Sequence, residues 1–434
     1  MISKLTHRTN FIWMCVVFVI ALVPRLVVIV HYGPQMTLHS DDQGYYQSAV
    51  WLLDKGTYSF YTPLKPTVHM MPGIVLLLAG IIAVFGKGTL GLYVGKLTFA
   101  IIGSLGIVGA FRAIERIANR YVAFVVALAL AFYPPSILVD SLFLTEPLFM
   151  AAFAWTVYYL LKLAETRKLS DLVALSVFFM LAMYLRPNVL LWAVVGLVYL
   201  LTKRYPTGLL ARHGAMAIGI FIVFMLPWWI RNEIVFHQFI PLTDDSWNPF
   251  LLGTFQGEGF PPPQNEGAVE HQLLAQNPQL RPQKMHELQW FLAERHAAVY
   301  RIRLWYHKHP GEFWLSYLWL KPKIIWYKAY YPLRILGVHP ALMKLVQHWL
   351  IWISLIGHAV AILFGKGRRL ELLMVLLTLL YFTAIFSVFF AFERYNVPIE
   401  WLMLMGGPAG LWALIRAARG GRGRGRANKR PMAA

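Results

Sequence analysis

The sequence predicts an all-α protein that crosses a membrane many times. Of its 434 residues, 58% are hydrophobic and 14% are charged. Apolar runs of about 20 residues, the length that spans the hydrocarbon core of a bilayer, recur along the chain. Lys and Arg gather in the short segments between alternate runs, as they do in cytoplasmic loops. Because a backbone in lipid must satisfy its own hydrogen bonds, the spanning segments should be helices.

The distribution of basic residues predicts the topology. About ten spans with both termini inside leave most basic residues in short inner segments: residues 11–31, 90–111, 122–139, 147–163, 172–185, 189–202, 209–230, 345–364, 370–392 and 397–415. The apolar stretch 72–86 is short for a span and is predicted to be re-entrant or interfacial. If it did cross, the basic cluster at 112–120 would lie outside. The first apolar run, residues 11–31, is longer than the core of a signal peptide. We expect it to be retained as a membrane anchor.

Charge and cysteine content also narrow the classes of protein to which this chain can belong. The formal net charge is +20, but the basic residues are explained by their side of the membrane. The Gly-Arg tail after Arg416 is expected to be flexible and to lie on the anionic inner leaflet, so no nucleic-acid partner is expected. Cys15 is the only cysteine, and an intrachain disulfide is therefore excluded.

An acidic stretch after the first span stands out in this basic chain. Ser40 and Gln43 have the spacing of a capping box, so a helix should begin at Asp41. It can run to Lys55, where Gly56 offers a left-handed stop. This helix would hold two carboxylates close to the membrane surface.

The two carboxylates of this helix are not equivalent. Asp41 shares a face with Tyr45 and Ala49, whereas Asp42 is about 100° further round the helix. Asp is also favoured at helix starts for purely local reasons. The position of the pair therefore does not by itself establish a function.

Further charged residues fall at the same predicted outer boundary. Acids and bases at membrane depth are costly, so each is a candidate for a functional site; structural ion pairs and snorkelling side chains are the alternative. The set comprises Glu146, Arg186, Arg231, Lys321, Glu393, Arg394 and Glu400.

The residue types in this set indicate a reaction. Arg and Lys suit a phosphate group, Arg through its two-point contact, and they can stabilise the charge of a departing phosphate. A carboxylate can take the proton of an attacking hydroxyl or amine. A phosphate at the lipid boundary indicates a lipid-linked donor. Together these groups favour transfer from a polyprenyl phosphate.

Three ordered stretches then resemble a known family. They are Asp41-x-x-x-Tyr45-x-x-x-Ala49 with Gly56-x-Tyr58 and Pro72-Gly73; Leu185-Arg186-Pro187 with Pro227-Trp228-Trp229-Ile230-Arg231-Asn232; and Glu393-Arg394-Tyr395-x-x-Pro398. In this order they resemble the bacterial protein O-mannosyltransferase and aminoarabinose-transferase group of integral-membrane glycosyltransferases, over most of residues 11–416. The resemblance implies the glycosyltransferase C fold, with about ten transmembrane helices, amphipathic helices on the outer face and a long outer loop.

The resemblance also implies roles for individual residues. Asp41 would be the general base of an inverting transfer, with Asp42 beside it, and Glu146 the second acidic site. Arg394 would lie near the donor phosphate, as would Arg231, Lys321 and Arg186. The expected substrate contacts are Tyr45, Tyr395 and Glu393. The acceptor is left open among lipid, glycan and protein. Two or three carboxylates could hold Mg²⁺ or Mn²⁺, and the need for a metal is left open.

The expected organisation has four parts. Residues 1–230 form a transmembrane catalytic module with the acidic first outer loop at 32–89. Residues 231–343 form an outer region, 344–416 the last transmembrane helices, and 417–434 a basic cytoplasmic tail. The expected location is the bacterial inner membrane, with the active site on the periplasmic face.

Other classes of membrane protein predict different patterns. A transporter or lipid flippase is the main alternative, and it predicts acids near the midplane and repeat-related broken helices. A glycan polymerase or ligase would depend more on Arg and His of the late outer loop. A scaffolding protein leaves the three ordered stretches unexplained.

Overall fold

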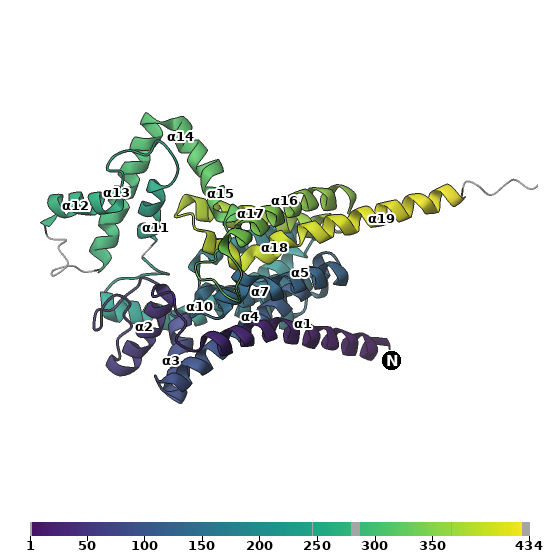
Figure 1. Ribbon diagram of the computed structural model, residues 1–434, viewed down its shortest axis with the longest axis horizontal. Coiled ribbons are helices and arrows are strands. Elements are labelled where there is room, and N and C mark those ends of the chain that lie inside the picture. The colour runs from purple at the N-terminus through teal and green to yellow at the C-terminus, as the bar shows by residue number, and fades with distance from the viewer. Residues whose placement is uncertain (1, 245, 279–286, 366, 428–434) are drawn as a thin grey trace, which may run out of the picture.

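The computed structural model describes residues 2–244, 246–278, 287–365 and 367–427, which form helices and their connections (Figure 1). Asp245 and residues 428–434 of the expected basic tail lie outside the described residues. The long helices lie side by side in a bundle. They are α1 (Ile2–Tyr32), α4 (Thr89–Ile117), α5 (Arg120–Phe132), α7 (Thr145–Thr166), α8 (Leu169–Met183), α9 (Ala193–Thr202), α10 (Thr207–Phe236), α16 (Pro340–Phe364), α17 (Arg369–Val388) and α19 (Gly406–Ala427).

Shorter helices connect these elements or cover one end of the bundle. Those between bundle helices are α6 (Pro134–Asp140), η1 (Pro187–Trp192), η5 (Glu393–Ile399) and α18 (Glu400–Leu404). Those at one end are α2 (Asp41–Lys55), α3 (Gly73–Phe85), α11 (Trp247–Leu252), η2 (Gly253–Phe255), α12 (Glu266–Gln276), α13 (Glu287–Lys308), α14 (Pro310–Leu315), the π-helical turn η4 (Ser316–Leu320) and α15 (Lys321–Tyr327).

The core of the bundle depends on close helix packing. α4 packs along α7, α7 along α8, and α16 along α19. A Cβ atom added at Gly106 of α4 would lie only 3.0 Å from the Cα atom of Ala151 of α7. Small residues let helices in a membrane approach this closely, and van der Waals packing then holds them together.

The structure supports a multi-pass protein with fewer full-length spans than predicted. By length and composition, seven helices among the described residues could cross a membrane, or eight if α5 and α6, bent by 66°, form one span. The prediction of about ten also counted α8 and the segment Pro187–Thr202, which are among the shorter apolar helices. The 15 residues of α8 extend only about 22 Å, against about 30 Å of hydrocarbon.

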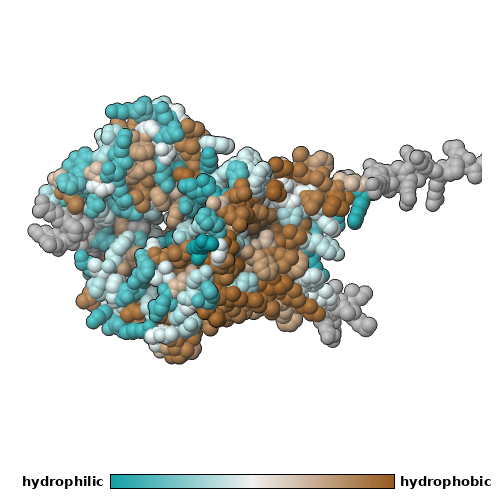
Figure 2. All heavy atoms as spheres, in the orientation of Figure 1, coloured by the Kyte–Doolittle hydropathy of each residue, from teal (hydrophilic) through white to brown (hydrophobic). Residues whose placement is uncertain are grey.

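The two ends of the bundle differ in character. The start of α1 and the end of α19 lie at one end, and α2 and α11 to α14 lie at the other (Figure 1). Apolar residues cover the bundle between them, whereas the α11–α14 region is largely hydrophilic (Figure 2). The expected flexible tail differs from the structure, because α19 continues as a helix to Ala427.

The helix predicted after the first span is present with its predicted ends. α2 runs from Asp41 to Lys55, and Gly56 follows it with a φ of 65°. The capping box was wrong, because Ser40 makes no side-chain cap. Asp42 bonds the preceding loop instead.

The segment between α2 and α3 is tied to two distant elements. Glu287 of α13 accepts hydrogen bonds from Thr67 Oγ1 at 2.7 Å and from the Val68 amide at 3.0 Å. Arg231 of α10 donates to the carbonyl oxygen of Thr67 at 2.8 Å. Three elements therefore meet at Thr67.

Candidate functional site

Two residues from opposite ends of the chain form the centre of the candidate site. Asp41 is the first residue of α2, and Arg394 lies in η5. Nη2 of Arg394 donates a hydrogen bond to Oδ2 of Asp41 at 2.6 Å. The Asp41 side chain is 37% exposed and that of Arg394 is 10% exposed. The carboxylate can therefore be reached by a ligand, while the guanidinium forms the wall behind it.

A second carboxylate lies on the buried side of Arg394. Oε1 of Glu146 is 2.9 Å from Nε of Arg394 and accepts a hydrogen bond from Nη2 of Arg186. The Glu146 side chain is 0% exposed, and its Oε2 atom has no hydrogen-bond partner. Asp41, Arg394, Glu146 and Arg186 thus form one alternating chain of charges, which we call the Asp41–Arg394 cluster.

Local sequence positions the two inner members of the cluster. Pro147 lies in the first turn of α7, where a missing amide is tolerated, and Glu146 stands beside it at the positive end of that helix. Arg186 precedes Pro187 and has the extended backbone that a following proline favours, with φ −144° and ψ 103°. Thr145 Oγ1 also accepts from two nitrogens of Arg186, each at 3.2 Å.

Aromatic side chains surround the cluster. The Arg186 guanidinium carbon is 5.5 Å from the centre of the Tyr395 ring, and that of Arg394 is 5.9 Å from the centre of the Tyr330 ring. Burial raises the pKa of the Tyr45 phenol, and the charge of Asp41 raises it further. Such phenols remain protonated at neutral pH and can donate a hydrogen bond.

Asp42 does not join the cluster through any contact between described residues. Its Oδ2 atom accepts from the Leu38 amide at 2.8 Å and from Thr37 Oγ1 at 2.7 Å, and its Oδ1 atom accepts from the Ser40 amide at 3.3 Å. The residue is 2% exposed. Asp42 therefore holds the loop that leads into α2.

Two of the predicted phosphate ligands have other partners. Arg231 bonds the carbonyl oxygen of Thr67 and lies 5.3 Å from the centre of the Tyr58 ring. Lys321 is fully buried, and its ammonium group donates to the carbonyl oxygens of Ser387 at 3.1 Å and Phe389 at 3.3 Å. These contacts hold loops and helices in place, and none of them joins Arg231 or Lys321 to the Asp41–Arg394 cluster.

The donor groups of the cluster do not fit a metal ion. Within the described ranges there is no group of three or more His, Cys, Asp or Glu side chains that could hold one. Asp41 and Glu146 are separated by Arg394, which pairs with both. Glu393, the neighbour of Arg394, is half-buried and has no ion-pair partner among the residues that the structure describes.

An apolar groove of about 930 Å³ lies beside the cluster. Its lining comes from α3, α4, α7, α8 and α10: Gly73, Leu76, Leu77, Ile102, Leu105, Leu148, Ala151, Ala152, Trp155, Phe178, Leu181, Tyr184, Leu185, Val223, Phe224 and Pro227. Leu148 stands two residues after Glu146, and Leu185 directly precedes Arg186. Two lining residues of the groove are thus close in sequence to the inner members of the cluster.

The structure explains why glycine stands at the second position of the Pro72-Gly73 stretch. Its amide donates to the carbonyl oxygen of Tyr184 at 2.9 Å. A Cβ atom at this position would lie 2.6 Å from that oxygen. The start of α3 can therefore approach the end of α8 only without a side chain, and this approach forms one wall of the groove.

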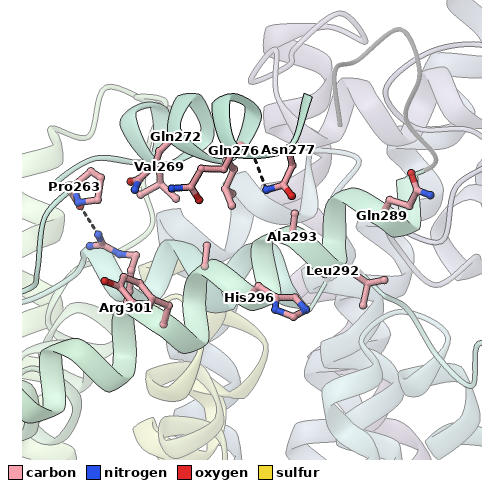
Figure 3. Close-up of a pocket in the computed structure, with 13 residues that line it drawn as sticks. Pro263, Val269, Gln272, Gln276, Asn277, Gln289, Leu292, Ala293, His296 and Arg301 are labelled. Atoms are coloured by element: carbon pink, nitrogen blue, oxygen red, sulfur yellow. Dashed lines mark hydrogen bonds between the residues drawn. The ribbon is translucent and has the colours of Figure 1, made fainter. Parts of the chain in front are cut away.

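A second cavity, of about 870 Å³, lies between α12 and α13 (Figure 3). Side-chain amides from both helices line it, among them Gln272, Gln276 and Gln289. The Nε atom of Arg301 is 2.8 Å from Thr254 Oγ1, and its Nη1 donates to the carbonyl oxygen of Pro263. The nitrogens of Arg301 are thus hydrogen-bonded to uncharged groups of the chain.

Comparisons with known proteins found one family match and several similar folds. Residues 65–230 match the family described as dolichyl-phosphate-mannose-protein mannosyltransferase. The fold is similar to that of the apo oligosaccharyltransferase of Archaeoglobus fulgidus, with 14% identity and a TM-score of 0.53, over 97% of this chain and 53% of that one. This chain thus spans about half the length of the archaeal enzyme. No curated protein matches the sequence.

Two further solved structures align with this chain at lower TM-scores. ArnT of Cupriavidus metallidurans bound to undecaprenyl phosphate aligns with a TM-score of 0.44 and 14% identity, over 92% of this chain and 77% of that one. The Archaeoglobus enzyme in complex with Zn and sulfate aligns with a TM-score of 0.43 and 14% identity, over 93% of this chain and 51% of that one.

The fold of the whole chain is therefore similar to that of the archaeal oligosaccharyltransferase, and the family match covers residues 65–230 of it. Over residues 65–230 the chain has the pattern of the dolichyl-phosphate-mannose-protein mannosyltransferase family. The resemblance found in the sequence is thereby confirmed. The enzyme class is favoured over the transporter, flippase and scaffolding alternatives.

Some contacts of the site could not be found from the sequence. Thr145 stands beside Glu146, and a hydroxyl next to a predicted acidic site is a weak signal that could have been used. Tyr330 lies in a connecting segment far from η5 in sequence, and nothing local indicates its position near Arg394.

Proposed function

We propose that this protein transfers a sugar from a polyprenyl-phosphate donor to a lipid, glycan or protein acceptor. The observation that carries the proposal is the position of the Asp41–Arg394 cluster beside an apolar groove. A polyprenyl-linked donor needs both surfaces, because its chain is apolar and its phosphate is anionic. The prenyl chain would lie in the groove, and its phosphate would meet Arg394 and Arg186.

The reaction follows from the charges of the cluster. A hydroxyl or amine of the acceptor attacks the anomeric carbon, the bond from that carbon to the phosphate oxygen breaks, and the phosphate leaves with the electron pair. Asp41 takes the proton of the attacking group, and the guanidinium of Arg394 stabilises the departing phosphate. Attack from the face opposite the phosphate inverts the anomeric centre.

The pairing of Asp41 with Arg394 gives the donor a second role in this mechanism. The phosphodiester of the donor, which carries one negative charge, competes with Asp41 for the guanidinium. Once Arg394 turns toward the phosphate, the Asp41 carboxylate loses this hydrogen-bond donor, and its Oδ2 atom can accept a hydrogen bond from the attacking group. Asp41 would then be available to the acceptor only when the donor is in place.

Glu146 would support this exchange from the buried side. Its Oε1 atom remains close to Arg394 and Arg186, and its free Oε2 atom can accept a hydrogen bond from the substrate. Because its side chain is 0% exposed, it is placed to orient groups rather than to exchange protons with solvent.

The proposed location is the outer face of the bacterial inner membrane. The Arg120 guanidinium donates to Asn10, which places the basic cluster at 112–120 beside the N-terminal part of α1. Asp41 lies after the other end of α1. The positive-inside rule assigns the basic end to the cytoplasm, which supports an outward-facing site.

The test is transfer of labelled sugar from a panel of synthetic polyprenyl-phosphate sugars by the purified protein. We expect one donor of the panel to be consumed, with release of the polyprenyl phosphate and inversion at the anomeric carbon. The Asp41→Asn variant is the control and should give no product. Movement of the intact donor across vesicle membranes without release of sugar would instead indicate a flippase.

A further inference from the structure

A third pocket, outside the catalytic cluster, lies where the α11–α14 region meets the bundle. It has a volume of about 760 Å³ and lies between α15 and α16, beside the loop at Gly257 and Glu258. Figure 1 places α15 at this junction. We call this cavity the α15–α16 pocket.

Unpaired positive charge distinguishes this pocket. Lys323 and Lys328 come from α15 and its C-terminal end, and Lys344 comes from α16. All three are exposed, and none has an ion-pair partner among residues 2–244, 246–278, 287–365 and 367–427. Glu258 is the only acid that lines the pocket. A cleft lined by one sign of charge concentrates ligands of the opposite sign.

The helix that forms one wall adds to this field. Ala341 and Lys344 lie in the first turns of α16, which begins at Pro340. Its first amides are already bonded, because Ala341 donates to the ring of His339 and Leu342 donates to the His339 carbonyl oxygen. An anion in the pocket would therefore meet the three ammonium groups and the partial positive charge of the helix end.

The rest of the lining indicates an amphiphile rather than a soluble anion. Leu320, Ile324 and Leu345 also line the pocket, and α16 is one of the helices that could span a membrane. Trp349 and Trp352 on the next turns of α16 are 58% and 40% exposed. The pocket therefore combines positive charge with an apolar wall that continues into a membrane-spanning helix.

We infer that the α15–α16 pocket binds the phosphate headgroup of an anionic membrane lipid. The three lysines would contact the phosphate, and the leucine and isoleucine side chains would contact the upper part of the acyl chains. Basic pockets between membrane helices bind anionic headgroups in this way. The site is distinct from the donor site proposed above and does not depend on it.

The test compares two triple variants of the full chain in detergent. One combines Lys323→Gln, Lys328→Gln and Lys344→Gln. The matched control combines Lys55→Gln, Lys65→Gln and Lys308→Gln, three exposed lysines of other loops and helix ends. Both lose the same charge and keep the basic tail. Binding of phosphatidylglycerol, of phosphatidylcholine and of soluble glycerol phosphate is measured by native mass spectrometry.

We expect one tightly bound phosphatidylglycerol on the wild type and on the control. Each lysine near a headgroup contributes about fivefold to affinity, so the pocket variant should bind on the order of a hundredfold more weakly. Equal binding by the two variants would overturn the inference. Equal binding of phosphatidylcholine, or displacement of the lipid by glycerol phosphate at the same concentration, would also overturn it. If the triple variant does not fold, Lys344→Gln alone, on an exposed helix position, should still lose about fivefold.

Discussion

Arg394 and Asp41 are 353 residues apart in the chain, yet Nη2 of the arginine lies 2.6 Å from Oδ2 of the aspartate. This contact joins the helix after the first span to the segment before the last one. It brings together the group proposed to take the proton and the group proposed to hold the phosphate. The predictions below separate their roles.

The first prediction distinguishes the two neighbouring aspartates. Asp41→Asn should abolish detectable transfer, because a general base contributes roughly a hundred- to ten-thousandfold to the rate, while donor binding survives. Asp42→Asn should retain activity with reduced stability, because Asp42 bonds only the 37–40 loop. Single-turnover assays on both purified variants measure this. Activity in Asp41→Asn with none in Asp42→Asn would reverse the assignment.

The second prediction concerns the arginine of this pair. Arg394→Lys should weaken donor binding or slow transfer at least tenfold, because a lysine cannot contact Asp41, Glu146 and a phosphate through one planar group. Donor titration and single-turnover rates would separate the two effects. Arg369→Lys, at an exposed position on α17, is the control. Wild-type kinetics in Arg394→Ala would remove Arg394 from the site.

The third prediction concerns the buried carboxylate. Glu146→Gln should lower the rate less than Asp41→Asn does, because the amide oxygen still accepts from Arg186. The melting temperature should fall, since two buried arginines lose a charged partner. Rate and melting temperature are measured on the same preparation. A rate loss as large as that of Asp41→Asn would mean that the two acids have exchanged roles.

The fourth prediction tests the topology. In a background with Cys15→Ser, a cysteine introduced as Asn119→Cys should not react with an impermeant reagent in intact cells, because the cluster at 112–120 should be cytoplasmic. Lys65→Cys, in the loop between α2 and α3, should react. Labelling at position 119 from outside would reverse the orientation of the bundle.

The fifth prediction follows from the buried lysine. Burial lowers the pKa of Lys321 to about 7, from its ordinary 10.5. Below pH 7 both the folded and the unfolded protein hold this proton. The folded protein is then destabilised by the whole free-energy cost of burying the ammonium charge. Between about pH 7 and 10.5 the unfolded protein binds more protons, so the free energy of unfolding rises with pH.

The measurement for this prediction is thermal unfolding in detergent. The melting temperature of the wild type should rise by a few degrees between pH 7 and 9. Lys321→Met should remove most of that rise, and Lys323→Met, at an exposed neighbouring position, should keep it. An equal rise in the two variants would show that another group is responsible.

The sequence predicted those features that local patterns determine. α2 and its stop at Gly56 follow from residues within one helix length, and the apolar runs follow from the thickness of a bilayer. Pairings between distant segments could not be predicted. The charges of residues and their spacing along the sequence do not show which residues of two different helices meet. The partners of Arg231 and Lys321 are backbone carbonyls, which every sequence offers at every position. Asp42 accepts from the Ser40 amide, which the capping box would have given to the Gln43 side chain, and no local rule decides between the two acceptors.

The meeting of three elements at Thr67 has a mechanical consequence. The α11–α14 region cannot move away from the bundle without pulling, through Glu287, on the segment between α2 and α3. Arg231 of α10 holds the same segment at Thr67, so this point stays fixed while the segment moves. An acceptor that displaces the α11–α14 region would therefore change the tilt of α2, and the distance between Asp41 and the sugar would depend on how the acceptor is seated.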